Sequence, residues 1–393
     1  MSARSGLNCD ILIVGAGLAG ASLACALRDS RMKVAVIESE APPAGGASWD
    51  QRIYALSPAS TEFLDELGIW KSIARNRIEA VRAMRIFGDD GASRLEFSAY
   101  QCAVERLATI AEEGEVRRSL WTALQGARNV TLLCPAAASE ISWGADSCEA
   151  RLSNGEIVTA RLVVAADGMH SAVRRAAGID ARIEPAGQRG VVANFACSVP
   201  HRGVAHQWFR DDGVMAWLPL PGQVFSMVWS TDEIHADELM QCEESGLCER
   251  VFAAGGGVLG NLSVLGGPAA FPLSWLSVPR RVGERLALIG DAAHVVHPLA
   301  GQGVNLGLGD ARELALQLRR ANDRGADAGE LLALRKFERA RAEAILAMRI
   351  ATKGLKGLFE ARGAAISRFR NIGLNLTDRA AVLKNMLARH AMG

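Results

Sequence analysis

Short apolar runs, each followed by a tight turn, form the clearest pattern in the first part of the chain. The first run covers residues 11–14 and leads into the turn Gly15-Ala16-Gly17-Leu18-Ala19-Gly20. A helical stretch then extends to Arg28, and a second apolar run at 34–37 ends at Glu38. Apolar runs of this length, bounded by turn signals, are typical of buried strands. The pattern therefore predicts a strand, a turn, a helix and a second strand.

The same segment also fits a secretory signal. Residues 11–27 carry no charge, Arg4 precedes them, and Ala24-Cys25-Ala26 resembles a small-residue cleavage site. A signal peptide has no reason to be followed by a matched strand and an acidic residue, so we favour the strand–turn–helix prediction. No other stretch reaches the roughly 18 consecutive apolar residues that span a bilayer, which predicts a soluble or peripheral protein.

Two later apolar runs also end at acidic residues. Residues 162–166 lead into Asp167-Gly168, and residues 286–289 lead into Gly290-Asp291. Ser171 is placed to cap a short helix after the first of these turns. Open α/β sheets bind ligands at the carboxyl ends of their strands, so both acids are candidates for a ligand site.

The turn at 15–20 has the spacing G-x-G-x-x-G, and each glycine in it has a physical role. Gly15 permits the tight turn, Gly17 lets the backbone approach a pyrophosphate, and Gly20 lets the helix pack closely on the strand. Glu38 lies where an acidic side chain would bind an adenosine ribose, which argues against a 2′-phosphate in this site. The motif alone does not distinguish NAD from FAD.

The order of these patterns predicts an α/β protein with two main units. Strands alternating with helices indicate a parallel sheet assembled from separate pieces of chain. The segment between them alternates apolar and polar residues with glycine and proline breaks, as a mostly β domain would. We predict a discontinuous Rossmann-like cofactor domain from residues 1–75, 100–180 and 276–328, a substrate-binding β domain from 76–99 and 181–275, and a C-terminal helical region at 329–393.

Composition removes several other classes of function. Of the 393 residues, 49% are apolar and 22% are charged, as in an ordinary globular protein. The formal net charge of +1 gives no overall field for nucleic acid, so we expect no nucleic-acid partner. The eight cysteines include no C-x-x-C pair, and the seven histidines have no plausible partner set, so we expect no metal site and reduced intracellular thiols.

Taken together, the three motifs resemble the flavin-dependent aromatic hydroxylases of the 4-hydroxybenzoate hydroxylase type. That family carries G-x-G-x-x-G, then D-G-x-x-S-x-V-R, then G-D-A-A-H, and residues 167–174 and 290–294 match the second and third motifs completely. The resemblance implies FAD as cofactor, with Asp291 at the ribityl chain and the loop from Pro298 to Asn305 along the isoalloxazine. The cofactor-binding residues it implies are Gly15, Gly17, Gly20, Glu38, Arg52, Arg117, Asp167, Gly168, Gly290, Asp291, Gly303, Val304 and Asn305. The flavin-positioning loop is Pro298, Gly301, Gln302 and Gly303, and no side chain is assignable as a catalytic acid or base.

The segment at 50–57, followed by Leu67-Gly68-Ile69-Trp70, is similar to the D-x-R-x-x-A-L-S…L-G-x-W pattern of the ubiquinone-biosynthesis hydroxylase subfamily. One departure stands out. Where this subfamily has V-E-N-R, with an arginine that reaches the flavin, Gly114 takes the place of the arginine. Either Arg117 or Arg118 substitutes for it, or the flavin is held more loosely.

The resemblance implies a monooxygenase that hydroxylates a polyprenylated phenol or benzoquinol intermediate of ubiquinone biosynthesis through a flavin C4a-hydroperoxide. NADH or NADPH would be a transient co-substrate, because the chain has no second G-x-G-x-x-G unit, and O2 would be the oxidant. Two alternatives stay open: a hydroxylase of a small soluble phenol or benzoate, and a flavin-binding accessory subunit of a quinone-synthesis complex.

The C-terminal part of the chain is basic. From Leu331 onward there are 13 Lys+Arg and 4 Asp+Glu, an excess of nine positive charges. Apolar residues recur among them at helical spacing, namely Leu355, Leu358, Phe359, Ile366, Phe369 and Ile372. Such a segment fits helices packed on the flavin domain, and it equally fits contact with an anionic surface. We expect a cytoplasmic protein, with peripheral contact at the inner face of the membrane as a further hypothesis.

Overall fold

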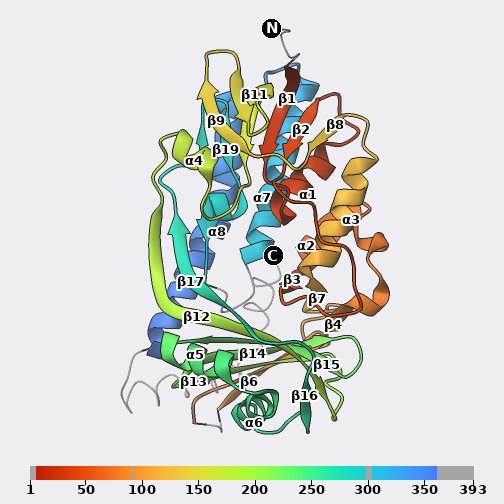
Figure 1. The fold of residues 1–393 in the computed structure, drawn as a ribbon, viewed down its shortest axis with the longest axis vertical. Helices are drawn as coiled ribbons and strands as arrows, with labels where there is room; N and C mark the ends of the chain where they lie inside the picture. The colour runs from red at the N-terminus through yellow and green to blue at the C-terminus, as the bar shows by residue number, and fades with distance from the viewer. Residues whose placement is uncertain (1–5, 91–92, 298–302, 361–393) are drawn as a thin grey trace.

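A mostly parallel sheet forms the upper part of the molecule (Figure 1). The computed structural model describes residues 6–90, 93–297 and 303–360. Within these residues the sheet has the strand order β18-β19-β11-β1-β2-β8, and β9 and β10 extend it from β11. The five strands from β19 to β8 run parallel. The bounds are β1 Leu7–Val14, β2 Val34–Ile37, β8 Val130–Leu133, β9 Ala138–Trp143, β10 Cys148–Leu152, β11 Ile157–Ala165, β18 Val282–Gly283 and β19 Leu286–Leu288.

The continuous apolar runs of this sheet follow from its position between two layers. Ile11 and Ile13 face a core that contains the large helices, whereas Leu12 faces a second core beneath β9 and β10. A sheet covered on both faces needs apolar side chains at every position, so its strands do not alternate. Because residues 11–27 lie inside this unit, interpreting them as a signal peptide is wrong.

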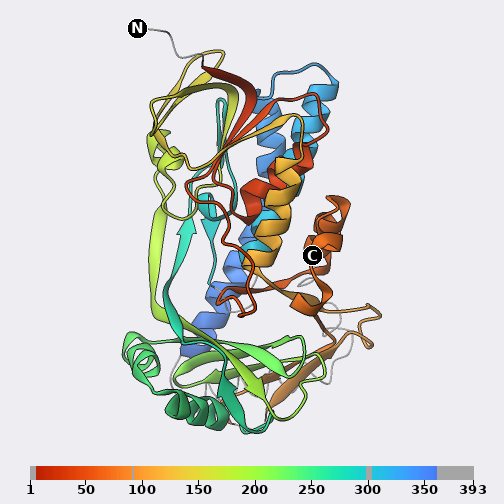
Figure 2. The same cartoon turned by 45° about the vertical axis from the view of Figure 1, so that its right-hand side comes forward.

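Helices cover one face of the parallel sheet, on its right-hand side in Figure 2. Helix α1 packs against α3 and α7, and α7 packs against α8. Helix α1 follows the first glycine turn and buries nine of its ten residues, which explains why it carries no charge. The bounds are α1 Leu18–Leu27, α2 Pro58–Glu66, α3 Glu113–Gln125, α7 Gly303–Asp323 and α8 Leu331–Glu360, while the short α4 Ala172–Ala176 lies on the opposite face.

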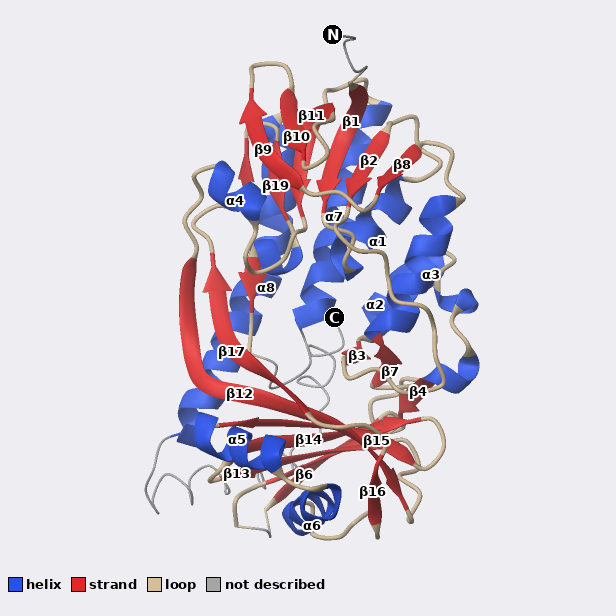
Figure 3. Cartoon of the chain, in the orientation of Figure 1, coloured by secondary structure: helices blue, strands red, loops and turns tan. Residues whose placement is uncertain are grey.

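A second, mostly antiparallel sheet forms the lower part of the molecule (Figure 3). Its order among the described residues is β20-β17-β12-β15-β14-β13-β5-β6, with β16 paired to β12. Helices α5 and α6 cover its outer face. The long strands β12 and β17 run from the upper part into this sheet. The bounds are β5 Ala83–Phe87, β6 Arg94–Ser98, β12 Arg182–Cys197, β13 Val204–Arg210, β14 Gly213–Leu220, β15 Val224–Thr231, β16 Leu262–Val264, β17 Ala269–Ser277, β20 His294–Val295, α5 Glu233–Gln241 and α6 Glu244–Ala254.

A small sheet lies between the two main units. It has the order β3-β7-β4, with β3 Ile53–Leu56, β4 Ile78–Val81 and β7 Ala108–Glu112. Ile53, Val81 and Ile110 from this sheet form one core with Ala205 and Leu220 of the lower sheet. The predicted α/β class with helices toward the C-terminus is confirmed, and residues 361–393 of the predicted helical region lie outside the described residues.

Candidate active site

The turns that follow β1, β11 and β19 meet at the carboxyl edge of the parallel sheet. Ala166 N donates a hydrogen bond to Val14 O (2.8 Å), and Ile289 N donates one to Ala165 O (3.0 Å). Each bond joins a strand end to the turn beside it. The three sequence motifs, which are far apart in the chain, therefore form one edge.

The three glycines of the first turn have different structural roles. Gly15 has φ +102°, and a Cβ there would lie 2.3 Å from Ala166 O. A Cβ at Gly20 would lie 2.0 Å from Gly15 O. No described atom lies within 4 Å of a Cβ built at Gly17. Gly15 and Gly20 are therefore required by the packing of the protein itself, whereas Gly17 borders open space.

Glu38 closes the first turn from the end of β2. Its Oε2 accepts a hydrogen bond from Ala16 N (2.6 Å), and its Oε1 accepts one from Glu40 N (3.2 Å). The Nη2 atom of Arg117 lies 3.6 Å from Glu38 Oε2 and donates to Glu40 O (2.7 Å). The two predicted residues Glu38 and Arg117 therefore lie together, beside the first turn.

Asp167 both builds the second turn and offers a spare acceptor. Its Oδ2 accepts hydrogen bonds from Ala172 N (2.7 Å) and Val173 N (3.1 Å), at the start of α4. Its Oδ1 is buried and has no hydrogen-bond partner among the described residues. Gly168 has φ +79°, and a Cβ there would meet no described atom within 4 Å.

Arg174 connects the second motif to the third. Its side chain is buried, with 3% of the residue exposed. Nη1 donates to Ala292 O (2.9 Å) and Nη2 donates to Met169 O (2.8 Å). Burial lowers the pKa of the guanidinium, and nearby Asp167 offsets part of this effect. The sequence identifies Arg174 as the last residue of the second motif, and the structure shows that its side chain reaches the third motif.

Asp291 follows β19, and two observations indicate that it faces a concave space, which we call the recess. The residue is exposed to solvent, yet the surrounding protein desolvates its carboxylate and raises its pKa. Nearby His294 opposes this rise, Glu113 adds to it, and Arg52 opposes it. A carboxylate that is both exposed and desolvated is expected in a concave site.

Near Asp291, the structure brings predicted Arg52 together with residues that sequence reasoning missed. Arg52 forms an ion pair with Glu113 (3.2 Å), and its guanidinium lies 5.6 Å from the ring centroid of Phe271 on β17. Burial raises the pKa of Tyr54 on β3, and the charges of Glu113 and Asp291 act in the same direction. No motif marks Tyr54, Glu113 or Phe271, because only folding brings their elements together.

The start of α7 is tied to the small sheet. Asn305 Oδ1 accepts a hydrogen bond from Ser57 N (2.8 Å), and Asn305 Nδ2 donates to Ala55 O (2.9 Å). Val304 packs on the core beneath the helices, and a Cβ at Gly303 would meet no described atom within 4 Å. The Asn305 side chain thus fixes the first turn of α7 to the main chain of the small sheet. The predicted loop residues Pro298, Gly301 and Gln302 lie outside the described residues.

Gly114, the departure from the subfamily pattern, lies under another arginine. A Cβ at Gly114 would lie 3.0 Å from Arg118 Nη1 and 3.0 Å from Asp50 Oδ2. Arg118 Nη1 donates to Pro43 O (3.1 Å). Arg118 therefore occupies the space above Gly114, whereas Arg117 lies beside Glu38.

Most aromatic residues of the lower sheet face away from this edge. Trp208, Trp217, Trp229, Phe195 and Phe225 form the core beneath α5 and α6. Strand alternation places them on the outer face. Phe271 lies beside Arg52, and Trp275, on the same strand, packs against His297 (5.3 Å between ring centroids), so both lie toward the cofactor unit.

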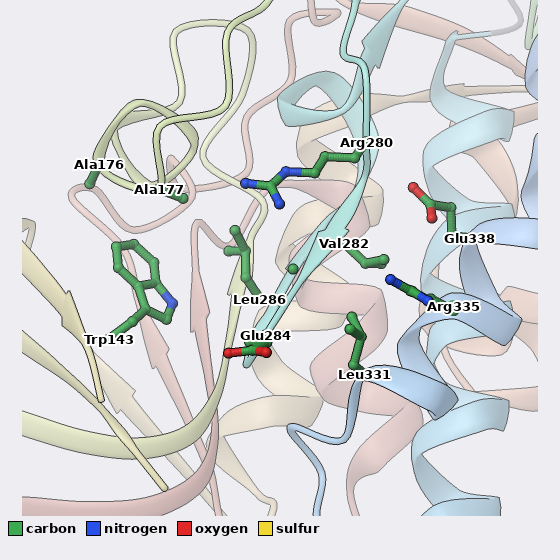
Figure 4. Close-up of a pocket in the computed structure, with 11 residues that line it drawn as sticks. Trp143, Ala176, Ala177, Arg280, Val282, Glu284, Leu286, Leu331, Arg335 and Glu338 are labelled. Atoms are coloured by element: carbon green, nitrogen blue, oxygen red, sulfur yellow. The ribbon is translucent and has the colours of Figure 1, made fainter. Parts of the chain in front are cut away.

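A separate recess of about 580 Å³ lies between α4, the β18–β19 hairpin and the start of α8 (Figure 4). Trp143 and Leu286 contribute apolar surface, and Arg280, Glu284 and Arg335 contribute charges of both signs. None of the predicted cofactor residues lines it.

The described part of the chain has neither a cluster of metal-ligating side chains nor a membrane-spanning helix. It contains no group of three or more His, Cys, Asp or Glu side chains placed to hold a metal ion. None of its helices is both long enough and apolar enough to cross a membrane.

The edge has the features that a bound dinucleotide requires. A helix begins at each of two open glycine positions, Gly17 and Gly303, so its free N–H groups face the same space. Asp167 Oδ1 is an unused buried acceptor, and Asp291 lies exposed in the recess. The residues present fit FAD. Fold and site thus define a dinucleotide-dependent α/β enzyme with a second sheet facing its cofactor edge.

The comparisons with known proteins make this class specific. Residues 8–348 match the family described as FAD binding domain, and the chain belongs to it. It is 35% identical to ubiquinone hydroxylase UbiL of Rhodospirillum rubrum, over 98% of this chain and 89% of that protein. It is 31% identical to 3-demethoxyubiquinol 3-hydroxylase of Escherichia coli, over 98% of both chains. Human mitochondrial ubiquinone biosynthesis monooxygenase COQ6 is 30% identical, over 97% and 92%.

Solved structures confirm the fold. PqsL of Pseudomonas aeruginosa in complex with 2-aminobenzoylacetate superposes with a TM-score of 0.79 at 24% identity, covering 93% of this chain and 99% of that one. The p-nitrophenol 4-monooxygenase PnpA of Pseudomonas putida gives 0.80 at 19% identity, covering 98% and 99%. The protein is an FAD-dependent monooxygenase with the 4-hydroxybenzoate hydroxylase-like fold that its motifs imply.

Proposed function

We propose that this enzyme hydroxylates the aromatic ring of a polyprenylated phenol or benzoquinol intermediate of ubiquinone biosynthesis, with NADH or NADPH as electron donor and O2 as oxidant. The observation that carries the proposal is the 35% identity to a ubiquinone hydroxylase over 98% of the chain. The recess at Asp291, where Arg52 meets Phe271, supports it by joining the cofactor edge to the lower sheet.

Each part of the edge then has a role toward FAD, which supplies the redox and oxygen-transfer chemistry when bound. Gly17 and the α1 N-terminus receive the pyrophosphate, and Glu38 holds the adenosine ribose. Asp291 accepts hydrogen bonds from the ribityl chain. The N-terminus of α7 supplies N–H groups to the ring system, and Arg52, which contacts Phe271 of the lower sheet, places a positive charge beside the cofactor.

The proposed substrate is tested by profiling quinone intermediates by mass spectrometry in cells that lack the gene. We expect a polyprenylated intermediate short of one hydroxyl group to accumulate, and the intact gene to clear it. A Gly17→Val gene is the matched control and should not clear it. An unchanged profile, with NAD(P)H oxidation stimulated by benzoates, would point to a soluble phenol as substrate. FAD binding without substrate-stimulated O2 use would indicate an accessory subunit.

We also propose that the end of α8 contacts an anionic membrane surface. Leu346 is 55% exposed and Ile350 is 64% exposed, one helical turn apart, with Arg349 between them. The sequence predicts that apolar residues from Leu355 to Ile372, interspersed with basic ones, extend this surface. The structure does not describe the side chains of these apolar residues. Exposed apolar side chains flanked by cations are typical of interfacial helices.

Co-sedimentation of the purified protein with anionic vesicles at low salt tests this contact. We expect binding that falls when Leu346 and Ile350 are both changed to Glu. Leu316→Glu, on an exposed site of α7, should leave binding unchanged. Equal binding to neutral vesicles, or no effect of the double change, would argue against the contact.

A further inference from the structure

Asp310 on α7 is a buried carboxylate that no part of the proposed mechanism uses. The residue has no exposed surface. Its Oδ2 lies 2.6 Å from His294 Nε2 and accepts a hydrogen bond from Gly290 N (3.1 Å). Its Oδ1 accepts a hydrogen bond from Nε of Arg341, on α8 (2.8 Å). One carboxylate thus connects two helices to the turn that follows β19.

The chain leaves space for this arginine. A Cβ at Gly309 would lie 2.7 Å from Arg341 Nη2 and 2.9 Å from its Cζ. Arg341 Nη2 also donates to Leu306 O (3.1 Å), which fixes the guanidinium against α7. A side chain at position 309 would push the guanidinium away from Asp310. The absence of a side chain at this helical position is therefore part of the arrangement.

The charge of Asp310 depends on its two partners. Burial by itself would raise the pKa of this carboxyl group, but His294 and Arg341 together hold it below the usual value. An isolated buried carboxylate is strongly disfavoured, so it needs a compensating cation. Arg341 supplies a permanent positive charge at every pH of interest.

The two partners of Asp310 on the turn after β19 lie on either side of Asp291 in the sequence. Gly290 immediately precedes Asp291, and His294 follows three residues later. Asp310 thus holds the turn on both sides of Asp291. We propose that Arg341 is a positioning residue that acts through Asp310, Gly290 and His294 to hold Asp291 where it binds FAD. The inference rests on the proposed contact between Asp291 and the ribityl chain.

Removing the cation should disturb this arrangement. In Arg341→Met, the buried carboxyl group of Asp310 loses its ion pair with Arg341 and keeps its contact with His294. Burial then acts on this carboxyl group with one compensating partner fewer, so the pKa of Asp310 should rise. The hydrogen bonds that hold Gly290 and His294 should weaken, and Asp291 should be positioned less well for FAD.

The test measures the dissociation constant of FAD for the apoprotein by flavin fluorescence. For Arg341→Met we expect binding weakened about 10- to 100-fold, by analogy with the loss seen when the hydrogen-bond partners of metal ligands are removed. Arg341→Lys, which keeps the charge, should recover most of the affinity. Arg339→Met, an exposed arginine on the same helix, should bind FAD like the wild type.

A double variant distinguishes a positioning role of Arg341 from a simple packing contact between helices. It also keeps the proposal testable if Arg341→Met fails to fold. In Asp310→Asn/Arg341→Met, the amide oxygen still accepts from His294 and Gly290 and no charge is buried. We expect FAD affinity close to wild type. If the double variant binds FAD as weakly as Arg341→Met, or more than about tenfold more weakly than wild type, the arginine acts only as a packing contact between helices and the proposal fails.

Asp291→Ala distinguishes this failure from a failure of the site itself. Loss of a hydrogen bond to a charged group costs about 1.5–3 kcal/mol, or roughly 10- to 150-fold in affinity. If Asp291→Ala weakens FAD binding while Arg341→Met does not, the site stands and the role of Arg341 is wrong. If neither variant weakens binding, the proposed contact between Asp291 and FAD is itself wrong.

Discussion

Gly17→Val is expected to give a folded protein that no longer binds FAD. No described atom lies within 4 Å of a Cβ at this position, so the apoprotein has room for the new side chain. Gly17 is the N-cap of α1 in an extended conformation, where losing the glycine costs less than about 1 kcal/mol. The valine methyl groups would fill the space that the pyrophosphate needs. We expect FAD affinity to fall by at least about 100-fold, which corresponds to about 2.7 kcal/mol.

Absorbance of the purified protein near the flavin bands measures this loss, and circular dichroism checks the fold. Gly246→Ala is the matched control, because a Cβ there also meets no described atom within 4 Å but the site is on α6, in the lower unit. Gly20→Val should instead destabilise the protein, since a Cβ there would lie 2.0 Å from Gly15 O. A fully yellow Gly17→Val protein would refute the assignment of this turn to FAD.

Arg174→Met is expected to destabilise the protein and to loosen FAD binding at the same time. The substitution leaves the buried carbonyl group of Ala292 and the part-buried carbonyl group of Met169 without their donor. An unsatisfied buried acceptor costs about 1–3 kcal/mol and a part-buried one costs less, so the free energy of unfolding should fall by about 2–4 kcal/mol. Because Ala292 directly follows Asp291, the turn at the recess should also lose its fixed position.

Urea unfolding of the apoprotein measures this change in stability. Arg175→Met is the matched control, because this neighbouring arginine donates to His170 O in an exposed position. We expect that control to lose less than about 1 kcal/mol, as surface substitutions usually do. Equal destabilisation by the two changes would mean that Arg174 does not connect the second and third motifs.

The extent to which sequence predicted the site differs from residue to residue. Gly15, Glu38 and Asp291 could be predicted as site residues because strand-end turns impose rules that extend over a few residues. Arg174 could be predicted as a motif position. That its side chain points inward could not be predicted, because the bond to Ala292 joins segments far apart in the chain. The choice between Arg117 and Arg118 above Gly114 was left open, and it depends on where the chain after β2 passes the start of α3.

Other residues left no local signal. Tyr54, Glu113 and Phe271 come from a small sheet, a helix start and the lower sheet, and they share a recess only after folding. Asp310 likewise left no local signal, because its proposed role depends on Arg341, which belongs to another helix. The Asn305 side chain holds the main chain of the small sheet, a use that the resemblance did not imply.

By itself, the sequence determined the elements at the cofactor edge and the class of enzyme. Backbone geometry allows only glycine at tight turns and close contacts, and buried parallel strands need unbroken apolar runs, so both leave marks that can be read locally. The tertiary structure alone decided which charges meet: Arg52 with Glu113 beside Phe271, Arg118 above Gly114, and Arg341 with Asp310 behind Asp291. Electrostatic and hydrogen-bond partners depend on distances through space, and the fold sets those distances independently of spacing along the chain.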